Sequence, residues 1–476
     1  METALTPLEF FRRSNKLYPN RTAVIDGEAK FTYRQFFERC NRWSVALQRL
    51  GVRPKDRVAY VAPNTHAELE SFYSVPQIGA ILVPINYRLS KEEFSYIINH
   101  CGARVVCVHS DYLEALQSIR MELTNVEHFV ALEGEKMGWI NYEQMIESLL
   151  SGPISHEINE LDLITINYTS GTTARPKGVM ITHRNAYMNS LGTLAHFHLS
   201  VEDRYLWTLP MFHANGWSFV WTITACGGVH VCLRKIDPEN IFNLIREENI
   251  SLFCAAPTIL IAMANAYDPL LMGLPGKLRI LTAGAPPAAA TIERIEQEIG
   301  WELTHVYGLT ETSPFIAICE ALPEHRQLEI WDRAIVKARQ GVELISSGEL
   351  IVADGANKEV PHDGKTVGEI IVRGNVLMKG YYDDLEETNK AIRDGWFHTG
   401  DAAVVNPDLY VEICDRIKDI IISGGENISS VELESVLLRH PSVMEVAVVG
   451  MPHEKWGESP HAFVVLKTGK SATKTN

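Results

Sequence analysis

Short β-prone runs alternate with helical patterns through the first two thirds of the chain, and this alternation constrains the fold more than any other feature. Between residues 22 and 110 the β-prone runs are TAVIDG, DRVAYVAPN, AILVPIN and ARVVCVHS, with helical stretches between them. The pattern returns from about residue 203 to 310, through RYLWTLPMF, GGVHVCL, SLFCAAP and KLRILTAG. Strands that alternate with helices favour a parallel sheet covered on both faces. We therefore expect an α/β fold with two doubly wound αβαβα subdomains.

The pattern changes near residue 348 and again after residue 416. GELIVADG, VGEIIVRGN, WFHTGDAAVVN and LYVEICDR read as short strands separated by turns, which indicates an antiparallel sheet or a small barrel. The stretch DIIISGGENISSVELESVLLRH then predicts a strand, a glycine turn and a helix, and MEVAVVG and HAFVVLK predict further strands. We expect a large domain over residues 1–416, which includes the small β-barrel-like subdomain, and a small α+β domain over residues 417–476.

The composition excludes several classes of protein. Of the 476 residues 46% are hydrophobic and 22% are charged, as in a globular protein. The net charge of −15 argues against a nucleic-acid-binding surface, so an anionic ligand must be held by a local pocket. The eight cysteines form no C-x-x-C pair, which indicates reduced thiols and a cytoplasmic location. The most apolar stretch, residues 250–264, is too short to span a membrane, and nothing in the sequence indicates an oligomeric state.

The stretch YTSGTTARPKGVMITHRN, residues 168–185, concentrates hydroxyl groups, glycines and basic side chains after a β-prone run. Hydroxyl and backbone N–H groups donate to phosphate oxygens, glycine allows the backbone to approach them, and Lys177 adds a positive charge. The stretch therefore predicts a polyphosphate cradle, although a polar surface turn is the simpler alternative. It is not the common NTPase loop, because Lys177 follows a proline and precedes a glycine.

Three more stretches carry side chains suited to a nucleotide. In HVYGLTETSP, Tyr307 could stack on a base, Thr310 could donate to a phosphate and Glu311 could bind Mg²⁺. In WFHTGD, Asp401 could hold both hydroxyls of a ribose, with Arg416 beside it. His213, in HANGW, is either a core histidine or a contact for a carboxylate substrate. Taken singly, each of these is more often a turn, a surface charge or a core residue.

Taken together, YTSGTTARPKG, YGLTET, WFHTGD and DRIKDIIISGGENIS resemble, in this order, the signature motifs of the adenylate-forming superfamily. The resemblance covers about residues 22–469 and is strongest to acyl-CoA synthetases for short-chain, medium-chain or aryl acids. It implies ATP, Mg²⁺ and coenzyme A as cofactors and a small carboxylic acid as substrate. In the implied reaction, the carboxylate attacks the α-phosphate of ATP, the small domain rotates, and the thiol of coenzyme A attacks the acyl-adenylate.

The resemblance also implies roles for individual residues. The phosphate cradle, the adenine and ribose contacts and the coenzyme A tunnel would be formed by Thr169, Ser170, Gly171, Thr172, Thr173, Gly284, Ala285, Pro286, Tyr307, Asp401, Arg416, Gly424 and Gly425. The residues implied at the reacting groups are Lys177, Thr310, Glu311 and His213, with Thr169 and Glu311 as Mg²⁺ ligands and Lys418 as the hinge. The acid would lie in an apolar pocket lined by Trp217, Phe219, Val220, Trp221, Gly284 and Thr312.

Two departures from the family pattern bear on activity. Ala174 stands where many members have glycine, which costs little if its φ is negative. The family's terminal P-K-[TS]-x-x-G-K segment is not found, and KTGK at residues 467–470 directly follows a strand, too early to replace it. We therefore expect a partial small domain and impaired adenylation with nucleotide binding retained.

The leading interpretation is an acid–thiol ligase that makes acyl-CoA through an acyl-adenylate. A second possibility is an adenylating enzyme whose acceptor is a separate carrier protein. A third is a pseudoenzyme or fragment that binds nucleotide or acyl-AMP without turnover. A conventional NTPase or kinase is disfavoured by the context of Lys177.

Overall fold

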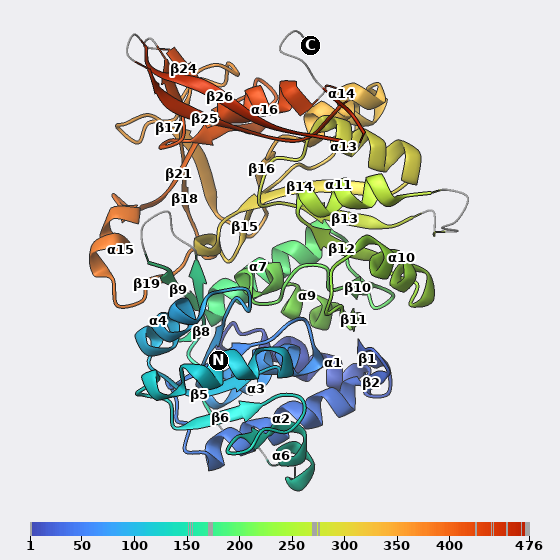
Figure 1. Cartoon of the computed structure of the whole chain (residues 1–476), viewed down its shortest axis with the longest axis vertical. Coiled ribbons are helices and arrows are strands. Elements are labelled where there is room, and N and C mark those ends of the chain that lie inside the picture. Colours follow the sequence, from blue (N-terminus) through green and yellow to red (C-terminus); the bar gives the residue numbers. More distant parts are fainter. Residues whose placement is uncertain are drawn as a thin grey trace.

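The structure is a computed structural model of the chain, which has a long, layered shape (Figure 1). It describes residues 2–150, 152, 154, 156–169, 175–268, 274, 277–423, 426–438, 440, 442–453, 456–467 and 469–471. Two large sheets with flanking helices form the lower and middle parts of Figure 1. Two smaller sheets lie above them, toward the C-terminus.

The first large sheet has eight strands in the order β19-β9-β8-β4-β3-β5-β6-β7. The strands from β8 to β7 run parallel, while β9 and β19 are antiparallel additions at one edge. The parallel strands are buried on both faces, as their near-continuous apolar sequences require. In the order of the sheet the strands are β19 (Gly380–Tyr381), β9 (Lys177–Thr182), β8 (Leu163–Thr169), β4 (Ile81–Pro84), β3 (Arg57–Val61), β5 (Ala103–Val108), β6 (His128–Ala131) and β7 (Ile140–Asn141).

The second large sheet has nine strands in the order β16-β15-β14-β13-β12-β10-β11-β1-β2. The first two strands of the chain belong here, because β1 pairs in parallel with β11, with Val24 opposite His230. The alternation between residues 22 and 110 thus contributes to both sheets. The strands are β16 (Val342–Glu343), β15 (Phe315–Ile318), β14 (Glu302–Gly308), β13 (Arg279–Thr282), β12 (Leu252–Ala255), β10 (Arg204–Leu206), β11 (Val229–Val231), β1 (Thr22–Asp26) and β2 (Ala29–Thr32).

The helices begin where the sequence supplies caps. Thr32, Ser90 and Thr182 each close a capping box at the start of a helix. The helical stretch predicted between AILVPIN and ARVVCVHS is confirmed as α4. The helices are α1 (Leu8–Leu17), α2 (Tyr33–Arg49), α3 (His66–Ser74), α4 (Lys91–Cys101), α5 (Leu113–Ser118), α6 (Tyr142–Ser148), α7 (His183–His196), α8 (Ala214–Trp217), α9 (Phe219–Cys226), α10 (Pro238–Glu247), α11 (Pro257–Ala266), α13 (Ala289–Arg294), α14 (Ile330–Lys337), α15 (Leu385–Ala391) and α16 (Ser430–Leu438).

The third sheet is antiparallel, as its short alternating strands predict. Its strands follow the order β17-β18-β21-β20, and β22 pairs with β21. They are β17 (Glu349–Ala353), β18 (Gly368–Arg373), β20 (Ile392–Arg393), β21 (Trp396–Val405) and β22 (Val411–Arg416). The α/β fold class with a small antiparallel subdomain is therefore confirmed.

A fourth sheet, in the order β24-β23-β26-β25, forms the C-terminal part at the top of Figure 1. Helix α16 packs on this sheet and contacts β22 of the third sheet. The Asp415 carboxylate accepts a hydrogen bond from Ser430 N at 2.8 Å, and Ser429 Oγ donates to the Cys414 carbonyl. The strands are β23 (Ile421–Ser423), β24 (Glu426–Ile428), β25 (Val443–His453) and β26 (Gly457–Leu466).

The run RYLWTLPMF forms a shorter strand than its sequence predicts. β10 ends at Leu206, and the chain then turns, held where Asn64 Nδ2 donates to the carbonyls of Trp207 and Leu209 at 2.7 and 3.0 Å. The buried Asn64 amide thus satisfies the two backbone carbonyls, which in a longer strand would accept hydrogen bonds from a neighbouring strand. The turn directs the following residues toward the end of β8.

Candidate functional site

Tyr307, Asp401 and Arg416 meet where the second and third sheets adjoin. Tyr307 lies near the end of β14, and its hydroxyl donates to Asp401 Oδ2. Asp401 and Arg416 are paired residues on β21 and β22, and Arg416 Nε lies 2.7 Å from Asp401 Oδ1. The structure thus brings together three predicted residues that are 15 to 109 positions apart in the sequence.

The Asp401 carboxylate is buried, while Arg416 is exposed. Burial raises the pKa of Asp401, and the nearby Arg416 guanidinium opposes that change. Burial and the neighbouring carboxylate also raise the pKa of the Tyr307 hydroxyl well above its ordinary value. Tyr307 therefore stays protonated and serves as a donor to the carboxylate, which leaves Asp401 with further lone pairs for a ligand.

The predicted phosphate stretch joins β8 to β9. Thr169, the last residue of β8, pairs with Lys177, the first residue of β9. A Cβ at Gly178 would lie 2.9 Å from Ile166 Cγ2, so glycine is needed there for the strands to pack. Five residues of the predicted cradle lie outside the described residues, and these are Ser170, Gly171, Thr172, Thr173 and Ala174.

A chain of polar contacts connects Lys177 to Glu311. Glu311 lies in η5 (Thr310–Thr312), directly after β14, and η5 lies against β9. The Tyr381 hydroxyl donates to Glu311 Oε1 at 2.8 Å, and Lys177 Nζ lies 5.1 Å from the centre of the Tyr381 ring. Lys177 also forms an ion pair with Glu387 on α15. Glu311 follows Tyr307 by four positions, just after the end of β14. This short segment connects the contacts around Lys177 to the cluster of Tyr307, Asp401 and Arg416.

Tyr381 and Glu387 were missed by sequence reasoning. Both belong to GYYDDLEETNKA, residues 380–391, where a tyrosine pair precedes an acidic helix. The signal was weak because an acidic first turn is common in ordinary surface helices. Only the pairing of β19 with β9 brings this segment to Lys177.

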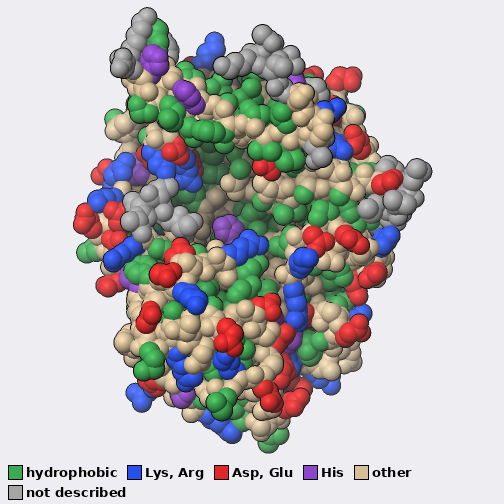
Figure 2. Space-filling view, in the orientation of Figure 1, with side chains coloured by type: hydrophobic (Ala, Val, Ile, Leu, Met, Phe, Trp, Pro, Cys, Tyr) green, Lys and Arg blue, Asp and Glu red, His purple; other side chains and the backbone are tan. Residues whose placement is uncertain are grey.

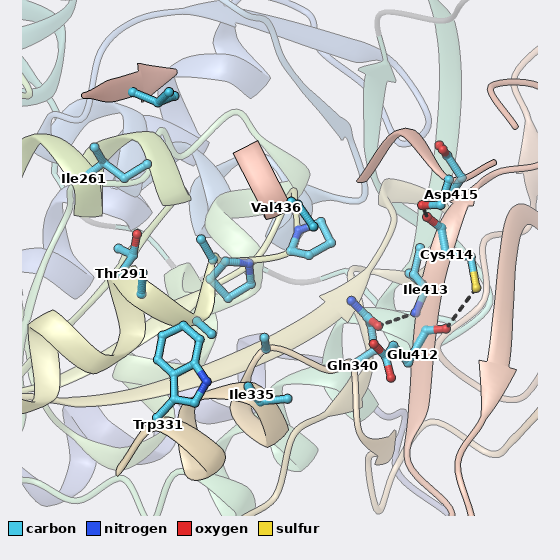
Figure 3. Close-up of a pocket in the computed structure, with 18 of the residues that line it drawn as sticks. Ile261, Thr291, Trp331, Ile335, Gln340, Glu412, Ile413, Cys414, Asp415 and Val436 are labelled. Atoms are coloured by element: carbon cyan, nitrogen blue, oxygen red, sulfur yellow. Dashed lines mark hydrogen bonds between the residues drawn. The ribbon is translucent and has the colours of Figure 1, made fainter. Parts of the chain in front are cut away.

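Gly284, Ala285 and Pro286 follow β13. Gly284 has φ +89° and a hypothetical Cβ there meets no atom within 4 Å, so the turn favours glycine for its conformation rather than for space. Pro286 lines a cavity of about 690 Å³ between α11, α13 and α14 on one side and the C-terminal sheet and helix on the other. Figure 3 shows Thr291, Trp331 and Val436 on its walls, with Ile413 and Asp415 of β22 at one side.

His213 precedes a turn of unusual backbone conformation. Ala214, Asn215, Gly216, Trp217 and Ser218 all have φ between 45° and 65°. Left-handed conformation in consecutive residues is costly and needs support from the surroundings.

The side chain of Asn215 supplies that support at the end of β8. Asn215 Oδ1 accepts from Asn167 Nδ2 at 3.0 Å, and Asn215 Nδ2 donates to Thr165 Oγ1 at 3.0 Å. The turn directs His213 outward, where its side chain is exposed, yet desolvation by crowded neighbours lowers its pKa. A neutral imidazole beside the phosphate stretch can accept or donate a hydrogen bond.

The predicted apolar wall of an acid pocket is wrong in part. Phe219, Val220 and Trp221 have no exposed surface, and Phe219 stacks on Tyr205 with ring centres 4.7 Å apart. These residues belong to the core because the left-handed turn points α9 into the protein. Figure 2 shows a hollow in the middle of this face, with hydrophobic and basic side chains among those that border it.

The remaining predicted residues lie near the C-terminal part. Lys418 is exposed between β22 and β23. Gly424 and Gly425 lie outside the described residues. Within the described part of the chain there is no group of three histidine, cysteine, aspartate or glutamate residues that could hold a metal ion, and no helix that is long and apolar enough to cross a membrane.

Comparisons with known proteins show the family of the chain. The family "AMP-binding enzyme" matches residues 11–382, and "AMP-binding enzyme C-terminal domain" matches residues 432–476. The chain is 40% identical to 4-hydroxybutyrate–CoA ligase 2 of Metallosphaera sedula, over 99% of this chain and 87% of the relative. It is 39% identical to a benzoate–CoA ligase of Arabidopsis thaliana that is named peroxisomal, over 99% of this chain and 84% of the relative.

A solved structure shares the fold across nearly the whole chain. The crystal structure of ATP-bound MatB from Rhodopseudomonas palustris has a TM-score of 0.85 and 25% identity, covering 98% of this chain and 90% of that one. The match to the C-terminal domain family argues against the alternative of an impaired pseudoenzyme.

Proposed function

The chain belongs to the AMP-binding enzyme family, and we propose that it is an ATP-dependent ligase that joins a short-chain, medium-chain or aryl carboxylic acid to coenzyme A. In the first step an acid carboxylate oxygen bonds to the α-phosphorus of ATP and pyrophosphate leaves. In the second step the coenzyme A thiol attacks the acyl carbon and AMP leaves. The relatives named as ligases of 4-hydroxybutyrate and benzoate support this range of acids.

Tyr307, Asp401 and Arg416 form the nucleoside part of the proposed site. The Asp401 carboxylate is oriented by Tyr307 and Arg416, and its remaining lone pairs suit the two hydroxyls of a ribose. The adenine would lie between the Tyr307 side chain and the segment formed by Gly284, Ala285 and Pro286. The space around Gly284, where a Cβ would meet no atom within 4 Å, supports this proposal.

The phosphate part of the proposed site extends from Thr169 to Lys177, with Thr310 directed at the α-phosphate. Lys177 supplies the positive charge, and the hydroxyls of Ser170, Thr172 and Thr173 and the backbone at Gly171 supply donors. Stabilisation of the charge that develops on the α-phosphate and on the leaving pyrophosphate during adenylyl transfer is the principal catalytic contribution that such a site makes.

Mg²⁺ would be held by oxygen atoms of Glu311 and Thr169. Mg²⁺ typically takes one or two protein carboxylates together with substrate phosphates and water. The donor set therefore fits Mg²⁺, and it does not require the three-residue cluster that the described part of the chain lacks. When bound, the ion would neutralise phosphate charge.

His213 and the C-terminal part complete the proposal. We assign the exposed His213 imidazole to a contact with the acid carboxylate. We propose a large domain over residues 1–416 and a small mobile one over residues 417–476, with Lys418 as the hinge and Gly424 and Gly425 at the coenzyme A tunnel. We keep a cytoplasmic location as a proposal, and fractionation would distinguish it from the peroxisome named for a relative.

The observation that carries this proposal is the Tyr307–Asp401–Arg416 cluster beside the phosphate stretch in a family of AMP-binding enzymes. The experiment supplies ATP, Mg²⁺ and coenzyme A with a panel of short, medium and aromatic acids, and follows AMP, pyrophosphate and acyl-CoA. We expect acid-dependent release of AMP and pyrophosphate with formation of acyl-CoA. Release of ADP, or AMP release that does not depend on any acid, would contradict the proposal, and transfer only to a carrier protein would identify another acceptor.

A further inference from the structure

Lys177 is held by a carboxylate that belongs to another segment of the chain. Its ammonium group forms an ion pair with Glu387 Oε2, and the second oxygen, Glu387 Oε1, lies 2.8 Å from Lys390 Nζ. The Lys177 side chain is 22% exposed and that of Glu387 is 30% exposed. The Glu387 carboxylate is thus shared between two lysines at the edge of the first sheet.

We propose that Glu387 is a positioning residue that competes with the phosphates of ATP for Lys177 and so sets the affinity of the site for the triphosphate. This inference rests on the proposed function, in which Lys177 binds the β- and γ-phosphates. Glu387 neutralises the Lys177 ammonium group and occupies one of its three N–H donors, so a phosphate that approaches Lys177 is repelled by this carboxylate and competes with it. Binding of the triphosphate therefore exchanges one anionic partner of Lys177 for another.

The position of Glu387 is set by its helix and not by the ion pair alone. Asp384 caps α15 by accepting from Glu387 N at 3.0 Å. Thr388 Oγ1 accepts from Tyr381 N at 2.8 Å and donates to the Asp384 carbonyl at 2.7 Å, which ties the helix to β19. Since β19 pairs with β9 beside Lys177, the carboxylate is carried by a frame that is anchored to the same sheet.

The Glu387 carboxylate is ionised throughout the pH range in which enzymes work, and it keeps Lys390 as a partner when Lys177 binds a phosphate. Hydrogen bonds from Lys177 and Lys390 lower its pKa to about 2. When Lys177 turns to a phosphate, Glu387 keeps its contact with Lys390, which it shares with Glu386. Glu387 therefore retains a cationic partner after the exchange.

The neighbouring Glu386 provides a matched control on the same helix. Glu386 Oε1 lies 2.7 Å from Lys390 Nζ, and no contact with Lys177 is found for it in the described part of the chain. Glu386→Gln and Glu387→Gln each remove one negative charge from the first turns of α15 and preserve side-chain shape. A difference between these variants therefore reports the contact with Lys177 and not the net charge.

The experiment measures the binding of Mg-ATP and of AMP to the full chain by calorimetry. We expect Glu387→Gln to lower the Kd for ATP by about two- to fivefold, as removal of a partly exposed competing ion pair should. The Kd for AMP should stay unchanged, because AMP lacks the phosphates assigned to Lys177. Glu386→Gln should change neither constant, and the gain for ATP should shrink as ionic strength rises.

Three outcomes would overturn the inference. They are an unchanged or raised Kd for ATP in Glu387→Gln, an equal effect on ATP and AMP, and a persistent effect of Glu387→Gln in a Lys177→Met background. Thermal melts of each variant show that folding is retained. If acyl-CoA still forms while any of these outcomes is seen, the competition is wrong and the ligase assignment stands. If the unmodified chain binds no ATP, both are wrong.

Discussion

Asp401 and Arg416 face each other on the adjacent strands β21 and β22, with Arg416 Nε 2.7 Å from Asp401 Oδ1. The Asp401 carboxylate is buried, whereas the Arg416 guanidinium reaches solvent. The ion pair therefore holds Asp401 Oδ1 in a fixed orientation. Tyr307 fixes the other oxygen from β14.

Replacing Asp401 with Asn tests the nucleoside part of the site. The change removes a charged acceptor for the ribose hydroxyls and leaves Arg416 without its partner. Loss of hydrogen bonds to a charged group typically costs about 1.5–3 kcal/mol, so we expect kcat/KM for ATP to fall by about 10- to 100-fold. The control is Asp394→Asn at an exposed position with φ 52°, which should retain full activity. Equal activity of the two variants would contradict a role for Asp401.

Replacing Lys177 with Met tests the phosphate part. The methionine keeps the length of the side chain but loses the charge, so we expect a fall of about 10- to 100-fold in kcat/KM for ATP, as for loss of a charge-assisted bond. Steady-state release of pyrophosphate measures this. Lys379→Met is the control, since Lys379 is exposed and donates to the Leu161 carbonyl at 3.2 Å. A comparable loss in that control would show a general effect of positive charge at this edge.

Gly308 offers a test of backbone geometry between Tyr307 and Glu311. A Cβ there would lie 1.8 Å from the Pro314 carbonyl oxygen, so Gly308→Ala must displace backbone on both sides. We expect a loss of about 1–3 kcal/mol in the free energy of unfolding, with reduced activity. Gly355→Ala is the control, because a Cβ there meets no atom within 4 Å. Denaturant titration measures the free energy of unfolding of both variants. Equal free energies of unfolding for Gly308→Ala and Gly355→Ala would contradict the expectation.

His66 predicts a dependence of stability on alkaline pH. Burial opposes its charge, but hydrogen bonds with Asp26 and Glu143 outweigh burial and raise its pKa from 6.5 to about 9. A raised pKa in the folded state stabilises the fold below pH 6.5, and that contribution is lost as pH rises from about 6.5 through about 9. The full contribution is on the order of 3 kcal/mol.

The measurement compares the free energy of unfolding at pH 6 and pH 9. We expect His66→Gln to be less stable than the unmodified chain at pH 6 and to show a flatter decline toward pH 9. The control is His198→Asn, at an exposed position with φ 48°, where the decline should persist. An unchanged slope in His66→Gln would show that another group carries the titration.

The order of the elements could be predicted from the sequence. Strand–helix alternation and short strands separated by turns depend on neighbouring residues, so α4, β13 and the antiparallel third sheet follow from local chemistry. The strand predicted through residues 204–212 failed because a buried contact from Asn64, far away in the sequence, supports a turn there instead.

Contacts between distant segments could not be predicted in the same way. The pairing of β1 with β11, the burial of Phe219 and Trp221, and the approach of Glu387 to Lys177 each depend on which surfaces pack together. Side-chain type alone does not specify such partners, because many sequences of the same polarity satisfy the same local pattern.

By itself the sequence determined the α/β class, the antiparallel part near residue 348 and the residue types offered to a nucleotide, since these depend on periodicity and on chemical groups. Tertiary structure alone decided that Tyr307, Asp401 and Arg416 converge, and that Lys177 has Glu387 and Tyr381 as neighbours. The physical reason is that binding chemistry needs groups a few ångströms apart, and only packing of separate sheets places residues from such distant positions at that range.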